Sequence, residues 1–200
     1  MELIALLGRT AAFSFAAGIN LYATVAIIGL ASRFDWVTLP RQFEIFDSNL
    51  VIGAALVLYL VEFFADKVPY VDTIWDIVHT AIRPLGGAFV AVASVGEASP
   101  AAQGLAALLG GTLAAGSHFT KAGTRAVANT SPEPFSNWAL SLAEDGLVVG
   151  LGLLALAYPV TALIITVVLV GLMAVFAAAI LRAVRRRFAR RPVPLAHITS

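Results

Sequence analysis

Cysteine is absent from the 200-residue sequence, which excludes disulfide bonds, thiol nucleophiles and cysteine metal sites. Three histidines, His79, His118 and His197, are too few for a histidine-rich metal site. The catalytic signatures HExxH, GxSxG, the P-loop and GxGxxG after a strand are also missing. We therefore expect no metal and no other cofactor. An enzyme is less favoured than a non-catalytic protein; Asp76 and His79 are the one acid/base pair that an intramembrane enzyme acting on lipid could use.

Charged residues are scarce as well, at 12% of the chain against roughly 25% in soluble proteins. Hydrophobic residues make up 60%, and the mean hydropathy is +0.89. Because a helix needs about 20 mostly apolar residues to cross a bilayer, the sequence predicts an all-α, polytopic transmembrane helix bundle of about six spans, some of them interrupted or interfacial. The expected spans are residues 10–32, 50–65, 85–96, 98–117, 146–158 and 160–181.

The basic residues are unevenly distributed, since six of the thirteen lie between positions 182 and 191. An arginine run directly after a long apolar stretch is typical of a topology signal that contacts anionic lipid, and we expect no nucleic-acid partner. The positive-inside rule then predicts a multi-pass protein of the inner (plasma) membrane, with its N-terminus and C-terminus both cytoplasmic. We expect one transmembrane helical domain over residues 1–191 and a disordered cytoplasmic tail over residues 192–200.

Ionisable side chains inside an apolar chain are costly, at about 2.5 to 3.5 kcal/mol for a charge at the centre of a helix, so they are candidates for a functional site. Glu62 and Asp66 are four residues apart and share a helix face, with Lys67 beside them. Lys67 and Asp66 are also consistent with a simple interfacial position. Glu62 lies one turn deeper, and an interfacial position explains it less well.

A second polar face follows along the chain, where Asp72, Asp76, His79 and Arg83 are spaced by four, three and four residues. Two interpretations are open. The helix over residues 71–83 lies in the membrane interface, or it dips inward so that its carboxylates and imidazole line a cavity. In either case Pro84 and the glycines after it are expected to break the helix before the next apolar run.

Two further polar groups lie in the second half of the sequence. His118 and Lys121 form a basic stripe with Arg125, a pattern that suits the cytoplasmic end of a span as well as an anion site. Glu144 and Asp145 directly precede an apolar run, and we expect Glu144 to face protein. Asn20, within the first span, is a candidate for a hydrogen bond between helices or for ligand contact. The candidate substrate or ion pathway is Asn20, Glu62, Asp66, Lys67, Asp72, Asp76, His79, His118, Lys121, Glu144 and Asp145.

Residues 72–96 and 135–158 each pair a polar helix bearing a tryptophan with a short glycine-bearing span. An internal repeat is therefore one option. Six spans would also divide into two halves of opposite orientation, as in many transporters. The tryptophan match pairs spans of the same orientation and does not support that division.

Residues 15–24 (FAAGINLYAT), 58–72 (LYLVEFFADKVPYVD) and 75–80 (WDIVHT) resemble a family of small bacterial integral membrane proteins catalogued only as a domain of unknown function. The resemblance covers most of the chain. It implies an integral membrane protein and lends no activity, substrate or site residues.

Residues 62–68 (EFFADKV) are also similar to the Glu-x-Gly-Asp-Lys-Thr signature of a family of membrane cation exchangers for calcium and manganese. Here the two acids are one residue further apart, Ala65 replaces the glycine and Val68 replaces the threonine. No second copy of the signature is present, since the later half offers only residues 118–121 (HFTK).

The favoured hypothesis is a small secondary transporter or permease, with proton coupling as one version, whose polar cavity near the cytoplasmic side contains Glu62, Asp66, Asp76, His79 and Glu144. The alternative is a non-transporting membrane scaffold or lipid-binding protein. Depth distinguishes them, because carboxylates buried among helices favour transport whereas carboxylates at headgroup level favour the scaffold. The expected partners are membrane lipids and a small solute or ion. A homo-oligomer stays open, because the spacing of Gly146 and Gly150 also suits packing within one chain.

Overall fold

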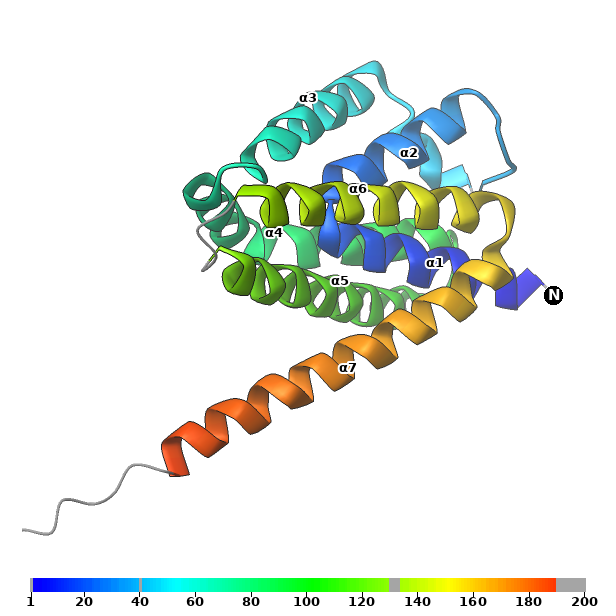
Figure 1. The fold of residues 1–200 in the computed structure, drawn as a ribbon. Helices are drawn as coiled ribbons and strands as arrows, with labels where there is room; N and C mark the ends of the chain where they lie inside the picture. The colour runs from blue at the N-terminus through cyan, green and yellow to red at the C-terminus, as the bar shows by residue number, and fades with distance from the viewer. Residues whose placement is uncertain (1, 40, 130–133, 190–200) are drawn as a thin grey trace, which may run out of the picture.

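The structure is a computed structural model that describes residues 2–39, 41–129 and 134–189. Within these ranges it is an all-α bundle without strands, as the sequence predicts (Figure 1). The tail expected from residue 192 onward lies outside the described residues. The elements are α1 (Glu2–Ile19), α2 (Leu21–Arg33), the 3-10 helix η1 (Arg41–Phe46), α3 (Asn49–Ala65), α4 (Pro69–Val95), α5 (Pro100–Ala128), α6 (Pro134–Ala157) and α7 (Pro159–Ala189).

Four of the described helices are long and apolar enough to cross a membrane: α1, α4, α6 and α7. Helices α2 and α3 are apolar but shorter, and α5 is long and carries a basic last turn. The chain therefore has the composition of a membrane protein. The predicted spans at residues 85–96 and 146–158 are the second halves of α4 and α6, whose polar first halves continue the same helices.

The first predicted span, residues 10–32, is two helices rather than one. Asn20 has an extended backbone (φ −146°, ψ 98°), and its side-chain oxygen accepts a hydrogen bond from the Ala23 amide at 2.9 Å to cap α2. Asparagine is among the preferred N-cap residues, so the break has a local cause. Arg9 of α1 donates to the Thr38 carbonyl, just beyond α2, at 3.4 Å. Helices α1 and α2 therefore form a V whose two open ends lie together (Figure 1).

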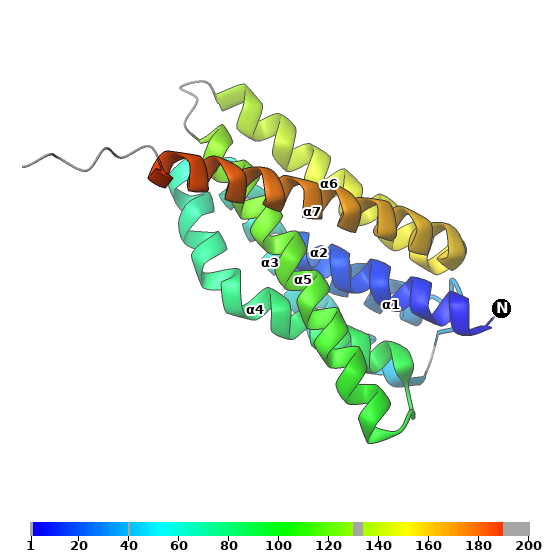
Figure 2. The same cartoon turned by 90° about the horizontal axis from the view of Figure 1, so that it is seen from below.

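The bundle has two ends, which we name after Arg9 and Asp66. At the Arg9 end, the Arg9 guanidinium reaches the carbonyls of Ala155 and Leu156 near the α6–α7 connection. At the Asp66 end, Asn137 of α6 donates to the Asp66 carbonyl at 3.1 Å. Helix α1 begins at the Arg9 end, and α7 runs away from it toward the Asp66 end (Figure 2). The two ends of the described chain thus lie at opposite ends of the bundle, which differs from the shared side expected for the termini. The difference arises because the chain turns back at Asn20.

Small residues allow α1, α4 and α5 to approach closely around the centre of the bundle. A Cβ atom added at Gly18 would lie 2.0 Å from Ser117 Oγ and 2.1 Å from the Ala114 carbonyl oxygen. One added at Gly87 would lie 2.3 Å from Ala114 Cβ. Close backbone approach at small residues is the usual way in which helices associate in lipid. It fixes the tip of the α1–α2 turn against α5.

Helix α4 is continuous from Pro69 to Val95, with Pro84 inside it, so the break expected at Pro84 is wrong. Helices among other helices tolerate an internal proline because neighbouring groups satisfy the freed backbone. The polar face of the first half, with Asp72, Asp76 and His79, is buried, whereas the apolar side chains Ile74, Ile77 and Val78 point outward. Of the two interpretations of residues 71–83, the structure matches the inward one. Helices α4 and α6, which hold the two segments of the faint repeat, run in the same direction.

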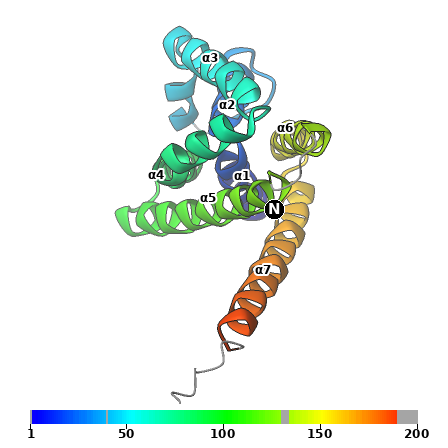
Figure 3. The same ribbon diagram turned by 60° about the vertical axis from the view of Figure 1, so that its left-hand side comes forward.

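Helix α7 diverges from the rest of the bundle (Figure 3). Its side chains Val168, Leu172 and Val175 are exposed, and little of its apolar span is buried inside the structure. It touches α5 through Met173 and Phe176, which face Gly116 and Gly123. An all-round apolar helix with so little protein contact requires a lipid environment or another apolar surface.

A buried ionic network as the candidate functional site

Charged side chains from four helices meet inside the bundle near the Asp66 end, and we call this set the ionic network. Its acids come from the end of α3 and the first halves of α4 and α6, and its bases come mainly from the last turns of α5. The bases near the end of α5 and Asp72 in the first turn of α4 suit the helix dipoles, whereas Glu62 and Asp66 at the C-terminal end of α3 oppose them and depend on their ion pairs. The members are Glu62, Asp66, Asp72, Asp76, Arg83, Lys121, Arg125 and Glu144.

Lys121 lies at the centre of the network and is 4% exposed. Its ammonium group donates to Asp66 Oδ2 at 2.9 Å and to Glu62 Oε1 at 3.4 Å, and it lies 3.7 Å from Glu144 Oε2. It also donates to the carbonyl of Ile19, the last residue of α1, at 3.2 Å. The cation thus stabilises both the acids and the free carbonyl end of the broken helix.

Arg125 joins α3 to α6 at the Asp66 end. Its NH2 group donates to Glu144 Oε2 at 2.5 Å and to Asp66 Oδ2 at 3.0 Å, while Nε donates to both Glu144 oxygens at 3.1 and 3.2 Å. NH1 donates to the Asp66 carbonyl at 2.7 Å and to Asn137 at 2.9 Å. A guanidinium that pairs with a carboxylate through two nitrogens is fixed in geometry as well as in charge.

Arg83 lies deepest and is fully buried. It donates to Glu62 Oε1 at 2.9 Å, to Asp76 Oδ1 at 3.1 Å and to His118 Nδ1 at 2.8 Å. Arginine only donates, so His118 Nδ1 accepts and carries no proton. The other ring nitrogen then donates to Thr80 Oγ1 at 3.2 Å, and that hydroxyl in turn donates to the Asp76 carbonyl. His118 is therefore neutral and held in one tautomer.

The partners of His79 fix one of its two ring nitrogens as a donor. Its Nδ1 lies 2.7 Å from the Trp75 carbonyl, which only accepts, so Nδ1 donates. Its Nε2 lies 2.8 Å from the Tyr22 hydroxyl oxygen. In the neutral ring, the hydroxyl donates to Nε2. The ring stacks on Trp75 with centroids 4.5 Å apart. The hydrogen bond between Tyr22 and His79 joins α2 to α4 beside the network.

Asp145 lies beside the network at the break between α1 and α2. Asn20 Nδ2 donates to Asp145 Oδ1 at 3.2 Å, while the same side chain caps α2 through its oxygen. The second oxygen, Oδ2, is buried and has no hydrogen-bond partner among the described residues. Glu62 Oε2 and Asp66 Oδ1 are likewise buried without a hydrogen-bond partner among the described residues. Asp72 Oδ1 is a fourth such oxygen, and Arg83 Nε is an unpartnered donor among them. Buried polar atoms of a native protein are normally paired, so four unpartnered carboxyl oxygens in one region require an explanation.

Acids outnumber bases in this region. Asp145 and the network together supply six carboxyl groups, against the three permanent cations Arg83, Lys121 and Arg125. His118 adds no charge in the tautomer derived above, and His79 adds none while the Tyr22 hydroxyl donates to its Nε2. Lys67, which is partly buried, adds at most a fourth cation. A fully ionised cluster would therefore hold two or three uncompensated negative charges away from water, and each costs several kcal/mol. No group of three or more ligand residues able to hold a metal ion occurs among the described residues.

Lys67 lies in the connection between α3 and α4 and outside the network. Its ammonium group lies 3.0 Å from the centroid of the Phe63 ring and donates to the Phe63 carbonyl at 2.8 Å and to Ser141 at 3.4 Å. Burial lowers the pKa of Lys67 below the usual 10.5, and the nearby carboxylate of Asp145 partly opposes this.

Two cavities reach the network from different sides. A cavity of about 130 Å³ lies between α4 and α5 and is lined by Asp72, Asp76 and Arg125. A larger one, about 310 Å³, lies between α1, α5, α6 and α7, and the charged side chains in its lining are Lys121 and Glu144. The ionic network separates the two.

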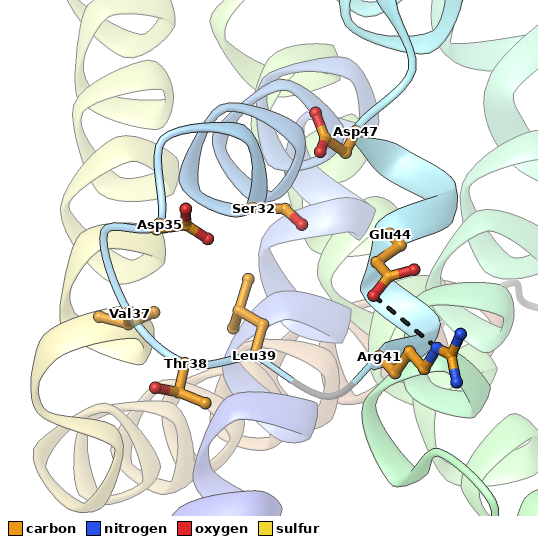
Figure 4. Close-up of a pocket in the computed structure, with 8 residues that line it drawn as sticks. All are labelled: Ser32, Asp35, Val37, Thr38, Leu39, Arg41, Glu44 and Asp47. Carbon is orange, nitrogen blue, oxygen red and sulfur yellow. Dashed lines mark ion pairs between the residues drawn. The ribbon is translucent and has the colours of Figure 1, made fainter.

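A further pocket lies at the Arg9 end, far from the network. It has a volume of about 360 Å³ and is formed by the loop after α2 and by η1, with Asp35, Glu44 and Asp47 around it (Figure 4). Arg41 pairs with Glu44 at 3.9 Å, and Arg33 pairs with Asp47 at 2.6 Å. No sequence pattern indicates this pocket, in which Glu44 and Asp47 each have an arginine partner.

Ten of the eleven candidate residues lie in or against the ionic network, and Lys67 alone lies outside it. The basic stripe lies toward the end of α5, as expected, and there it is buried with ion-pair partners, which its spacing does not indicate. Glu144 faces protein, as expected, through its pair with Arg125. Two members, Arg83 and Arg125, are missing from the candidate set. Their spacing of four from His79 and Lys121 was the available signal, and it indicated membership of the same faces.

The fold and this site define a helical membrane-protein bundle with a charged network buried at its core. The chain belongs to the family described as Domain of unknown function (DUF4126), whose profile matches residues 7–179. The match covers every helix that contributes to the network. No curated protein and no solved structure matches the chain.

Proposed function

We propose that the protein is a small proton-coupled secondary transporter whose ionic network binds and releases the coupling proton. The observation that carries the proposal is the buried surplus of carboxyl groups, with unpartnered oxygens on Glu62, Asp66 and Asp145. Buried acids with partial partners exchange protons more readily than they remain charged. Protons therefore supply the compensation that the three cations lack.

Asp145 is the proposed proton carrier. It has no salt bridge among the described residues, since its one hydrogen-bond donor is the neutral amide of Asn20. Asn20 is also the residue at which α1 ends and α2 begins. A change of charge on Asp145 therefore acts directly on the helix break. Discontinuous helices of this kind line the central sites of many transporters.

The proposed location is the inner (plasma) membrane, with the Asp66 end toward the cytoplasm. The argument is the positive-inside rule, because the exposed arginines Arg182, Arg185 and Arg186 of α7 belong to that end. This orientation keeps the basic C-terminal segment cytoplasmic, as expected from the sequence. The same orientation places the start of α1 on the non-cytoplasmic side. The reason is that α1 starts at the Arg9 end and α2 returns to that end.

A proton-binding experiment tests the proposal without knowledge of the solute. Purified protein in detergent is titrated from acid to neutral pH, and the protons released are counted for the wild type, for Asp145→Asn and for Asp35→Asn. Asp35 lies in the exposed loop at the Arg9 end and serves as the matched control. Between pH 5 and 8 we expect the Asp145→Asn variant to release about one proton fewer than the wild type. The Asp35→Asn control should release as many protons as the wild type in that range.

A transport experiment follows with proteoliposomes that contain a pH-sensitive dye. Solutes of different classes are added outside, and solute-dependent proton movement is recorded for the wild type and for Asp145→Asn. We expect at least one class to move protons in the wild type and none to do so in the variant. Equal proton release by the wild type and Asp145→Asn, together with no solute-dependent proton movement, would refute the proposal.

The second candidate is a non-transporting scaffold or lipid-binding protein. It is favoured by the end of α7, where exposed arginines adjoin the exposed apolar side chains Ile180 and Leu181. Such a segment binds anionic headgroups by charge and acyl chains by burial. Replacement of Arg182, Arg185 and Arg186 by glutamine separates the two candidates. The scaffold loses binding to anionic lipid and its cellular role together, whereas the transporter keeps its proton release.

A further inference from the structure

We propose that the cavity between α1, α5, α6 and α7 binds a hydrophobic organic cation, with its ammonium group against Glu144. This inference rests on the proposed function, for which it names the class of substrate. The cavity has a volume of about 310 Å³, and its lining is mostly apolar, with Phe15, Leu140, Leu169, Met173 and Phe176 among the contributors. Sites for small organic molecules have this character and begin at about 300 Å³.

Charge determines which kind of molecule fits. The cavity meets the network at Glu144, whose side chain is 14% exposed and is the most accessible carboxylate of the network. Lys121 also lines the cavity, but its ammonium group already donates to Asp66 and to the Ile19 carbonyl. An anionic solute would add to a region in which acids already exceed bases. A cation reduces that excess and gains a charge-assisted hydrogen bond.

The aromatic rings strengthen the same choice. Phe15 of α1 and Phe176 of α7 line the cavity from two helices. The face of an aromatic ring attracts a cation that has left water, and it packs well against an apolar body. The polar lining residues Ser117, Thr120 and Thr124 all come from α5. Ser117 and Thr120 already donate to backbone carbonyls. Glu144 accepts from Arg125 through both oxygens, and as a carboxylate it keeps lone pairs for a further donor.

Access to the cavity is from the side of α7. This helix diverges from the bundle, and its exposed apolar side chains make it a loosely held wall (Figure 3). A molecule with a hydrophobic body concentrates in the bilayer and reaches such a wall laterally. The same apolar wall excludes small hydrated ions, because removing such an ion from water costs free energy that the wall does not return.

Binding of the cation and binding of a proton then compete. When an ammonium group enters beside Glu144, the region gains one positive charge, and a carboxyl group such as Asp145 releases one proton to water in exchange. The total charge of the region is unchanged by the exchange. The structure thus assigns an antiport of one hydrophobic cation against about one proton, because each carries one unit of charge.

The probe is 4-phenylbutylammonium, compared with 4-phenylbutanoate and 4-phenylbutanol, which share its body and differ in charge. Affinity is measured by titration calorimetry on the full chain in detergent at neutral pH. We expect the ammonium compound to bind about tenfold tighter than either analogue or better. Equal or tighter binding of the carboxylate would overturn the proposal.

Two variants locate the site. Met173→Trp fills the cavity without changing any charge, and we expect it to abolish binding of the ammonium compound. Glu144→Gln removes the carboxylate, and we expect about tenfold weaker binding, with recovery in Glu144→Asp. Asp35→Asn, at the Arg9 end, is the control and should bind normally. Unchanged affinity in Met173→Trp would overturn the proposal even if Glu144→Gln fails to fold.

Proton release separates this inference from the function on which it rests. Calorimetry near pH 6, within the range in which Asp145 is proposed to titrate, in buffers of different ionisation enthalpy counts the protons released on binding. We expect a net release of up to one proton, which Asp145→Asn abolishes. Binding without proton release would leave the cavity assignment standing and count against proton coupling. No binding, with the proton titration of Asp145 intact, would count against the cavity assignment alone.

Discussion

Removal of a base from the ionic network should cost more stability than removal of an acid. Arg125→Met keeps the length of the side chain and deletes its charge. It leaves Asp66 and Glu144 without the donors that now lie 2.5 to 3.2 Å from their oxygens. The loss of one partner from a buried ion pair typically costs about 3 to 5 kcal/mol, because the other charge stays buried and uncompensated.

Asp145→Asn is the matched change on the acidic side. Asparagine keeps an oxygen to accept from Asn20, and the replaced oxygen, Oδ2, has no hydrogen-bond partner among the described residues. The change also removes one of the surplus acids. We therefore expect a cost below about 1 kcal/mol, or a gain in stability. The structure thus predicts a difference of about 2 to 5 kcal/mol between two single neutralisations in one region.

The free energy of unfolding is measured for both variants in mixed micelles of increasing denaturing detergent. Arg41→Met is the control, because Arg41 forms a pair with Glu44 in which the two side chains are 84% and 69% exposed. An exposed pair of this kind contributes only about 0 to 1 kcal/mol. Equal costs for Arg125→Met and Asp145→Asn would show that the region is balanced in charge, and the argument from surplus carboxyl groups would fail.

Three other predictions address packing, ionisation and orientation. Gly18→Leu should destabilise the protein by at least about 3 kcal/mol, measured in the same micelles, because the new side chain meets the backbone of α5. A reagent that attacks only neutral amines should label Lys67 with a pH midpoint below the usual pKa of 10.5, because burial favours the uncharged amine. In denatured protein the labelling should show the ordinary midpoint. Lys121 should not react in the folded protein, since it is buried. Because the chain has no cysteine, single substitutions Thr38→Cys and Arg186→Cys can be labelled without background. They should react from opposite sides of the membrane, and labelling from one side would contradict the proposed orientation.

Much of the bundle could be predicted because hydrophobic run length is a strong signal. The end of a run is a weaker one. Asn20 is the single amide side chain in an uncharged run of 23 residues, and a capping asparagine cannot be told from one that bonds across helices by composition alone. Pro84 is the opposite case. It has the chemistry of a helix breaker, yet α4 continues through it, since packing decides whether a proline ends a helix.

The site could be predicted in its members but not in its pairings. Spacing places Asp72, Asp76, His79 and Arg83 on one helix face, and the structure confirms that they share a face. Spacing within one helix carries no information on which other helix lies opposite. Arg125 was therefore interpreted by its place at a helix end, whereas its partners Asp66 and Glu144 come from helices 59 and 19 residues away along the chain.

The turn at Asn20 has a consequence for the order in which the molecule is built. Its tip is held by Asp145, 125 residues later, and by Lys121, which binds the Ile19 carbonyl across 102 residues. Residues 2–33 leave the ribosome first, yet the groups that stabilise their V shape do not exist until α5 and α6 have been synthesised. The V of α1 and α2 therefore cannot reach its final packing until α6 has been synthesised.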